Sequence, residues 1–162
     1  MIRDSKSTDV IATFVIYNLP DRECGTTKHR GELENTGPGE NSYMGFIDDI
    51  KTAVSKFPEI SVAFIIEPGS ISNSILYGDD PRCAAADPMY QRMITYAITT
   101  LSLTNIYLYL DGGDSGTLGW DDKINVAAKK FTSIYNGAEK PGNLRGVRIS
   151  HCSSYCGADW CI

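Results

Sequence analysis

Three apolar, β-branched stretches divide this chain, and each ends in a polar segment punctuated by glycine or proline. They run from Val10 to Tyr17, from Ser61 to Ile66 and from Asn105 to Leu110. Continuous apolar runs of this length are typical of strands that are buried on both faces. Because parallel α/β proteins present their functional groups at the carboxyl ends of such strands, the polar segments are the candidate functional positions.

Segments with helical periodicity separate these strands. Apolar residues recur at helical spacing from Tyr43 to Phe57, and Pro58 closes that element. A second helix is expected to begin at Asp87 and Pro88, a cap residue followed by proline in the first turn. A third helix is expected roughly from Asp122 to Tyr135.

The alternation of strands and helices predicts βαβ units and a parallel sheet, and therefore an α/β fold. A fourth strand is expected from Arg145 to Ile149. A closed parallel barrel takes about 250 residues, whereas this chain has 162. We therefore expect an open sheet or part of a distorted TIM-like (β/α) barrel, whose exposed sheet edges favour self-association.

Composition and charge limit the partners of the chain. With 42% hydrophobic and 22% charged residues, it has the composition of a globular protein. A net charge of -5 argues against nucleic acid or an anionic membrane as partner. No apolar run approaches the roughly 20 residues that span a bilayer. Phosphate-binding and dinucleotide-binding motifs are absent from the sequence, so we expect no cofactor.

The periodicity stops near Ser150, and three of the five cysteines lie beyond it. Cys152, Cys156 and Cys161 follow His151, but their spacing matches no strong zinc template, so we expect no metal. A tail read through a frameshift or intron and a local disulfide are the other interpretations. We expect one domain over residues 1–149 and a diverged cysteine-rich tail over residues 150–162.

The polar strand ends resemble the signature segments of glycoside hydrolase family 6. The segments are Asp21-Arg22-Glu23-Cys24, Glu67-Pro68-Gly69-Ser70 and Asp111-Gly112-Gly113. Members of that family are secreted cellobiohydrolases and endoglucanases that hydrolyse β-1,4-glucan with inversion. The similarity runs from about Val10 to Ile149 and covers only the middle of the family's catalytic domain. It implies a β-1,4-glucan or cello-oligosaccharide ligand and an extracellular location, although the first nine residues lack the apolar core of a secretory signal.

The same resemblance implies an impaired catalytic set. Inversion requires a protonated carboxyl group that donates to the leaving oxygen and a second carboxylate that activates water. In the family pattern the acid is the aspartate of Glu-Pro-Asp-Ser, where this chain has Gly69. Glu23 stands where the family has the aspartate that tunes the pKa of the acid, and Asp111 matches a third active-site aspartate or simply caps a turn. Glu67 shares the side of the strand on which Gly69 lies, but the resemblance gives it a structural place further down the barrel.

The family's sugar-binding positions are partly changed. Tyr17 matches a tyrosine that presses on the distorted sugar ring, or it is a core residue at the end of a strand. His29 occupies a loop position near the catalytic water, and Asp114 stands where the family has a histidine. Trp120 is retained, with a packing role as the alternative interpretation.

The resemblance also implies a disulfide between Cys24 and Cys83 at the rim of the site. Cys83 follows Gly69 by 14 residues, which is the family's spacing between acid and cysteine. Such a bond requires an oxidising compartment. Three functions remain open: an impaired glucan hydrolase, a non-catalytic glucan-binding or interaction protein, and a truncated gene product with no autonomous fold.

Overall fold

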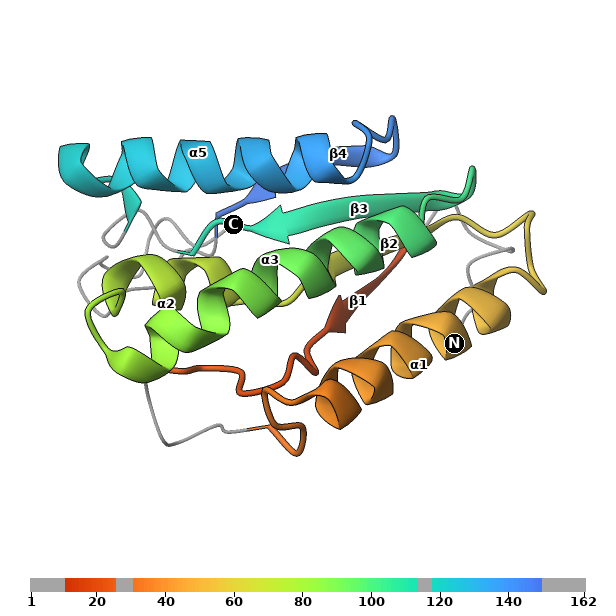
Figure 1. The fold of residues 1–162 in the computed structure, drawn as a ribbon. Coiled ribbons are helices and arrows are strands. Elements are labelled where there is room, and N and C mark those ends of the chain that lie inside the picture. Colours follow the sequence, from red (N-terminus) through yellow and green to blue (C-terminus); the bar gives the residue numbers. More distant parts are fainter. Residues whose placement is uncertain (1–10, 26–30, 114–117, 150–162) are drawn as a thin grey trace, which may run out of the picture.

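The computed structural model describes residues 11–25, 31–113 and 118–149, and Figure 1 shows its elements in chain order. The strands are β1 (Ala12–Ile16), β2 (Val62–Ile66), β3 (Ile106–Asp111) and β4 (Leu144–Arg148). The helices are α1 (Gly37–Val54), α2 (Ser70–Leu76), α3 (Pro81–Thr100) and α5 (Asp121–Gly137). All four predicted strands are confirmed to within two residues at each end.

The four strands form one parallel sheet in the order β1-β2-β3-β4. Val15 pairs with Ile65, and Ile65 pairs with Tyr109, so the first three strands are in register. The register between β3 and β4 shifts between Leu108 and Tyr109. The predicted α/β class is confirmed, and the parallel direction brings the polar carboxyl ends of the strands to one edge of the sheet.

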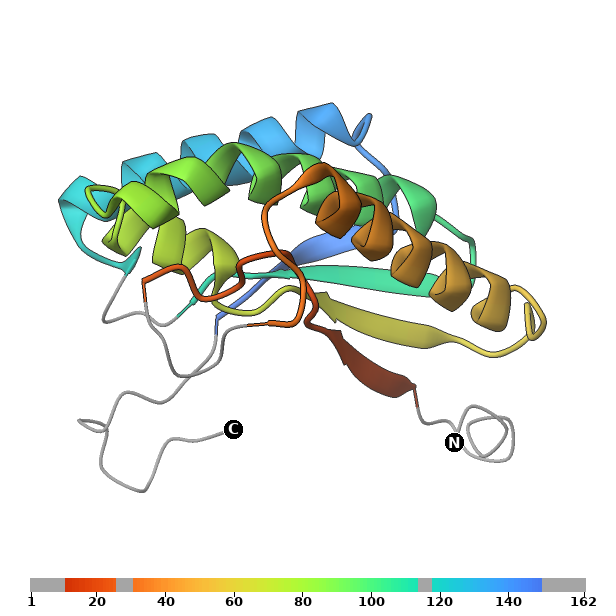
Figure 2. The same ribbon diagram turned by 60° about the horizontal axis from the view of Figure 1, so that its bottom comes forward.

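The described helices all cover the same face of the sheet, which the turned view in Figure 2 shows most clearly. Side chains that alternate along the strands point toward these helices and form the buried core, among them Ile16, Phe64 and Leu108. On the opposite face Val15 is 57% exposed, while Tyr107 and Tyr109 are half-buried. The sheet therefore has the form of one wall of a parallel barrel.

The predicted start of the second long helix was wrong. The helix α3 begins at Pro81 instead, where the Asp80 carboxylate accepts a hydrogen bond from the Arg82 amide at 2.8 Å. Asp80-Pro81 has the same cap-proline pattern as Asp87-Pro88, and the earlier pair prevails because Cys83 and Ala86 bury their side chains in the core. Pro88 consequently lies inside the helix.

One further helix was not expected, and another begins earlier than expected. The helix α2 was not predicted, because seven residues rich in serine carry too little apolar periodicity. The helix α1 begins at Gly37 rather than Tyr43, and the Thr36 hydroxyl caps it by accepting from the Gly39 amide at 3.4 Å. The last predicted helix is confirmed as α5.

Candidate functional site

A cleft of about 460 Å³ lies at the carboxyl ends of β1 and β2, lined by Val15, Tyr17, Glu23, Pro68 and Gly69. Three of these residues were expected in the site from the sequence: Tyr17, Glu23 and Gly69. The structure thus brings together groups that lie up to 52 residues apart, because the parallel strands end at the same edge.

On the β1 side of the cleft, the Tyr17 hydroxyl donates a hydrogen bond to the Glu23 carboxylate. The Arg22 guanidinium lies over the Tyr17 ring, 4.4 Å from its centroid, and donates to the Tyr17 carbonyl at 2.6 Å. Burial, and then the Glu23 carboxylate, raise the pKa of Tyr17 well above its usual range. Tyr17 is therefore a neutral phenol that binds and orients Glu23, rather than a simple core residue.

On the β2 side, Gly69 adopts a left-handed backbone with φ +77° and ends the turn before α2. Its amide donates to the Asp111 carboxylate at 3.0 Å. A Cβ atom at this position would meet only the Asn73 side-chain nitrogen, at 3.6 Å. The position thus has room for a side chain but carries none, and the Gly69 backbone conformation favours glycine.

Asp111 ends β3 and is 4% exposed. One of its carboxylate oxygens accepts from the Gly69 amide and from the Gly113 amide, each at 3.0 Å. Asp111 therefore joins the ends of β2 and β3 and caps the turn after β3. A catalytic contribution from Asp111, like that of Glu23, stays a prediction.

Glu67 lies directly after β2 and is 1% exposed. Its backbone is left-handed with φ 46°, so the two-residue alternation of the strand does not continue to Gly69. The expectation that Glu67 shares the side of Gly69 was therefore wrong. Its carboxylate instead accepts from the Asn18 amide at 2.9 Å and the Leu19 amide at 3.2 Å.

Burial raises the pKa of Glu67 from 4.5 to about 7, against the lowering effect of the Asn18 and Leu19 amides. The Tyr43 hydroxyl also lowers this pKa, although the pair lacks the geometry of a full hydrogen bond. Sequence reasoning gave Glu67 no part in the site. One feature of the sequence could have indicated its importance: Glu67 is a glutamate placed between a buried apolar strand and a Pro-Gly turn.

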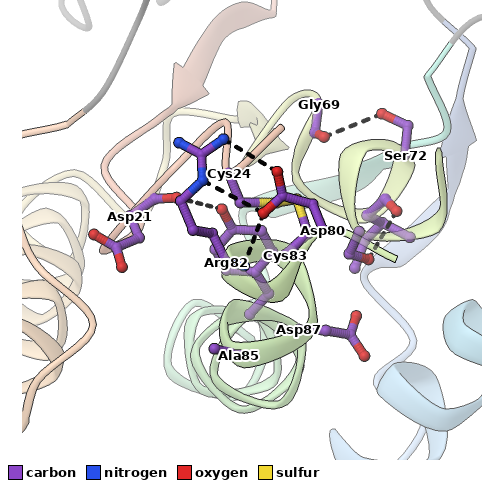
Figure 3. Close-up of a disulfide and its surroundings, with 12 residues drawn as sticks. Asp21, Cys24, Gly69, Ser72, Asp80, Arg82, Cys83, Ala85 and Asp87 are labelled. Atoms are coloured by element: carbon purple, nitrogen blue, oxygen red, sulfur yellow. Dashed lines mark hydrogen bonds and ion pairs between the residues drawn. A yellow bond between two sulfur atoms is a disulfide. The ribbon is translucent and has the colours of Figure 1, made fainter. Parts of the chain in front are cut away.

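Figure 3 shows the disulfide between Cys24 and Cys83 with the capped start of α3 beside it. Both cysteines are buried, and the bond joins residues 59 apart in the sequence. It attaches the segment that carries Glu23 to the first turn of α3. The pairing implied by the family resemblance is confirmed in this structure.

The other expected sugar-binding residues are Trp120, His29 and Asp114. Trp120 is 66% exposed at the start of α5 and is not among the described residues that line the cleft, and both interpretations of its role stay predictions. His29 and Asp114 lie outside the described residues. The described residues include no group of three metal-binding side chains and no helix able to cross a membrane.

Comparison with known proteins gives a consistent result. The profile of the family described as Glycosyl hydrolases family 6 matches residues 1–159. Exoglucanase 3 of Agaricus bisporus is 34% identical over 146 residues, which cover 90% of this chain and 33% of the relative. Exoglucanase 2 of Hypocrea jecorina is 38% identical over 134 residues, 83% of this chain and 28% of the relative.

Solved structures agree with the sequence comparisons. The catalytic core of a cellobiohydrolase from Chaetomium thermophilum superposes with a TM-score of 0.86 at 32% identity. Cellobiohydrolase II from Humicola insolens, in complex with glucose and cellotetraose, gives a TM-score of 0.85 at 32% identity. Each match covers 91% of this chain but only 42% of the solved chain. This chain spans about a third of the length of the curated relatives it matches, and its sheet corresponds to part of their TIM-like barrel.

Proposed function

This chain belongs to glycosyl hydrolase family 6, and from that premise we propose that it binds β-1,4-glucan at the cleft but hydrolyses it poorly. The observation that carries the proposal is Gly69, which stands at the position of the family's general acid and has no side chain. Among the described residues that line the cleft, Glu23 alone carries a carboxyl group. General acid catalysis contributes typically 10²–10⁴-fold, so its loss leaves glucan hydrolysis slow.

Tyr17 and Glu67 do not replace the missing acid. The Tyr17 hydroxyl is a poor proton donor because burial and Glu23 raise its pKa well above the usual range. Glu67 keeps its proton up to about pH 7, but its oxygens face the amides of Asn18 and Leu19 instead of the cleft. Neither of these two groups would therefore act as the acid for a glycosidic oxygen bound in the cleft.

We expect this cleft to bind glucan even though it lacks the general acid that hydrolysis requires. The Tyr17 ring, Val15 and Pro68 give the cleft an apolar surface on which a sugar face can pack, and Glu23 offers an acceptor for sugar hydroxyls. The similar enzyme from Humicola insolens was solved with cellotetraose. We therefore take a cello-oligosaccharide as the ligand of the cleft.

The decisive experiment measures reducing ends released from amorphous cellulose. Wild type is expected near the buffer background, whereas Gly69→Asp restores a carboxyl group and should raise the rate at least tenfold. Gly69→Asn is the matched control, since it has the same size and backbone demand but no acidic proton. Equal rates for wild type and Gly69→Asp, both well above background, would overturn the impairment. Equal rates for the Asp and Asn variants would show that the missing acid is not what limits hydrolysis.

A non-catalytic glucan-binding protein is the second candidate, and the hydrogen-bonded Tyr17–Glu23 pair favours it. A thermal unfolding scan with and without cellotetraose tests this function, because a ligand that binds only the native state raises the transition temperature. An unchanged cooperative transition would exclude glucan binding. A scan without any cooperative transition would favour the truncated product with no autonomous fold.

We further propose that this domain, residues 1–149 without the tail, acts outside the cell and associates with a second copy. The disulfide between Cys24 and Cys83 fits an oxidising compartment.

The association with a second copy would involve the edges of the sheet. In the described sheet, β1 and β4 are the outer strands. A two-fold axis along the strands would pair each β4 with β1 of the other copy in parallel. Arg148 of β4 would then approach Glu23. Light scattering after gel filtration should give a dimer, weakened by Arg148→Glu; a monomer at all concentrations would contradict this.

A further inference from the structure

The backbone of Glu67 is fixed on both sides. Its amide donates to the Ile16 carbonyl at 2.8 Å and so continues the pairing of β2 with β1. Its carbonyl accepts from the Ser70 amide at 3.2 Å and from the Ser70 hydroxyl at 2.7 Å. A left-handed φ of 46° is uncommon for glutamate and costs about 1 kcal/mol or more. This conformation turns the side chain away from the strand alternation and toward β1.

The Glu67 side chain crosses from the end of β2 to the segment that follows β1. Its two oxygens accept from the Asn18 amide at 2.9 and 3.1 Å, and one of them also accepts from the Leu19 amide at 3.2 Å. Leu19 is fully buried, so water cannot easily replace the carboxylate as partner of this amide. Hydrogen bonds to an ionised acceptor are roughly twice as strong as neutral ones.

We propose that Glu67 is a positioning residue for the cleft, in which its carboxylate holds the Asn18–Leu19 backbone and thereby fixes Tyr17. Tyr17 precedes the held segment directly, lines the cleft and orients Glu23. This role rests on the proposed function, since it assigns to Glu67 the shape of the surface on which glucan is bound. Glu67 itself is not among the described residues that line the cleft.

The protonation state of Glu67 decides whether it can fulfil this role. The groups that face it are Tyr17 and Arg22 from the segment after β1, Tyr43 from α1 and Tyr90 from α3. Burial raises the pKa of each of these three phenols above its usual range, so they remain neutral while Glu67 titrates near pH 7.

A protonated carboxyl group has one oxygen that must donate, so it cannot accept from both amides as the carboxylate does. The Leu19 amide has the longer hydrogen bond and is expected to lose its partner first. The ionised form of Glu67 is therefore the form that holds the segment, and the cleft is most firmly shaped above about pH 7.

Amide proton and nitrogen resonances of the whole chain, recorded from pH 5.5 to 8.5, test the positioning role without any ligand. The Asn18 and Leu19 amides should shift with a common midpoint near pH 7 in wild type. Glu67→Gln should abolish both titrations, and Glu40→Gln, which removes a surface carboxylate paired with Arg92, should leave them unchanged. Amides that do not titrate in wild type, or that still titrate in Glu67→Gln, would overturn the proposal.

Binding of cellotetraose to the same proteins supplies the functional readout. Wild-type affinity should rise at least threefold between pH 5.5 and 8, whereas Glu67→Gln should bind more weakly and without this pH dependence. An identical pH dependence in both proteins would overturn the positioning role. Glu67→Asp is the second variant if Glu67→Gln does not fold: it retains a titrating carboxylate and should keep the pH-dependent affinity, and a flat profile would contradict the proposal. A folded wild type that shows the amide titration but never binds cellotetraose would refute the glucan function alone.

Discussion

The two walls of the cleft are built in different ways. On the β1 wall, side chains hold the backbone: the Glu67 carboxylate binds two amides, and the buried disulfide attaches Cys24 to Cys83 of α3. On the β2 wall, Gly69 contributes a backbone amide to Asp111 and no side chain. One wall is thus fixed by strong cross-connections, while the other is a short turn with space beside it.

The contrast between the two walls indicates which parts of such a site the fold itself requires. The disulfide and the Glu67 contacts both connect segments that are distant in sequence, and loss of the disulfide would weaken folding as well as function. A catalytic acid at position 69 would add a polar group to a cleft wall without joining any elements. Such a group can disappear at little cost to stability, because sites commonly trade stability for activity.

The largest effect is expected from the disulfide. Replacing both partners, as in Cys24→Ala with Cys83→Ala, removes a cross-link between residues 59 apart and should cost about 4 kcal/mol of unfolding free energy. Denaturant unfolding in oxidising buffer measures this loss. Adding reductant to wild type should bring its midpoint to that of the double variant. Coinciding midpoints already in oxidising buffer would mean that the β1 wall does not depend on the bond.

The next effect is a pH dependence that arises from Glu67. The folded-state pKa of about 7 lies above the ordinary value of 4.5, so the native state binds the proton more tightly than the unfolded state. Its contribution to stability is therefore complete below pH 4.5 and is lost as the pH rises through 7. The shift corresponds to a loss on the order of 3 kcal/mol.

Unfolding free energies of wild type and Glu67→Gln between pH 4 and 8 measure this term, since the other carboxyl groups are common to both proteins. As the pH rises, the unfolding free energy of wild type should fall relative to that of Glu67→Gln. A constant difference would contradict the shifted pKa. The carboxylate that holds the cleft would thus lower the stability of the fold, which is the reverse of the effect of the disulfide on the same wall.

The sequence predicted the elements whose signal is local and regular. The first three strands were found because each is a continuous apolar run in the sequence, and the parallel pairing of the sheet followed from the helices between the strands. The start of α3 was missed because two cap-proline pairs compete, and burial of Cys83 decides between them only in three dimensions. Likewise α2 is too short to show a period.

Within the site, the sequence identified positions but not contacts. The grouping of Tyr17, Glu23 and Gly69 followed from the family resemblance and the strand ends, and the cleft lining unites them. The orientation of Glu67 could not be predicted, because a left-handed residue interrupts the alternation on which such reasoning depends. Its partners are backbone amides, which every sequence has and which therefore leave no signal.

A smaller effect should follow removal of Asp111, the residue on which the β2 wall depends. Asp111→Ala leaves the Gly69 and Gly113 amides without their carboxylate, which should cost about 2–3 kcal/mol. Asp111→Asn keeps one acceptor oxygen and should cost about half as much. Denaturant unfolding measures both. Asp122→Ala, at an exposed position of α5, is the control and should stay within about 0.5 kcal/mol of wild type.

The smallest effect is expected at Gly69 itself. A Cβ atom there meets no atom closer than 3.6 Å, so the cost of Gly69→Ala is the left-handed backbone alone, about 1–2 kcal/mol. Asparagine tolerates this backbone better, and Gly69→Asn should lose less than Gly69→Ala in denaturant unfolding. Equal losses would mean that the turn relaxes to another conformation, and the Asp111 contact would then change with it. A loss as large as that of the disulfide variant would contradict the contrast between the two walls, because the β2 wall would then be as essential to the fold as the β1 wall.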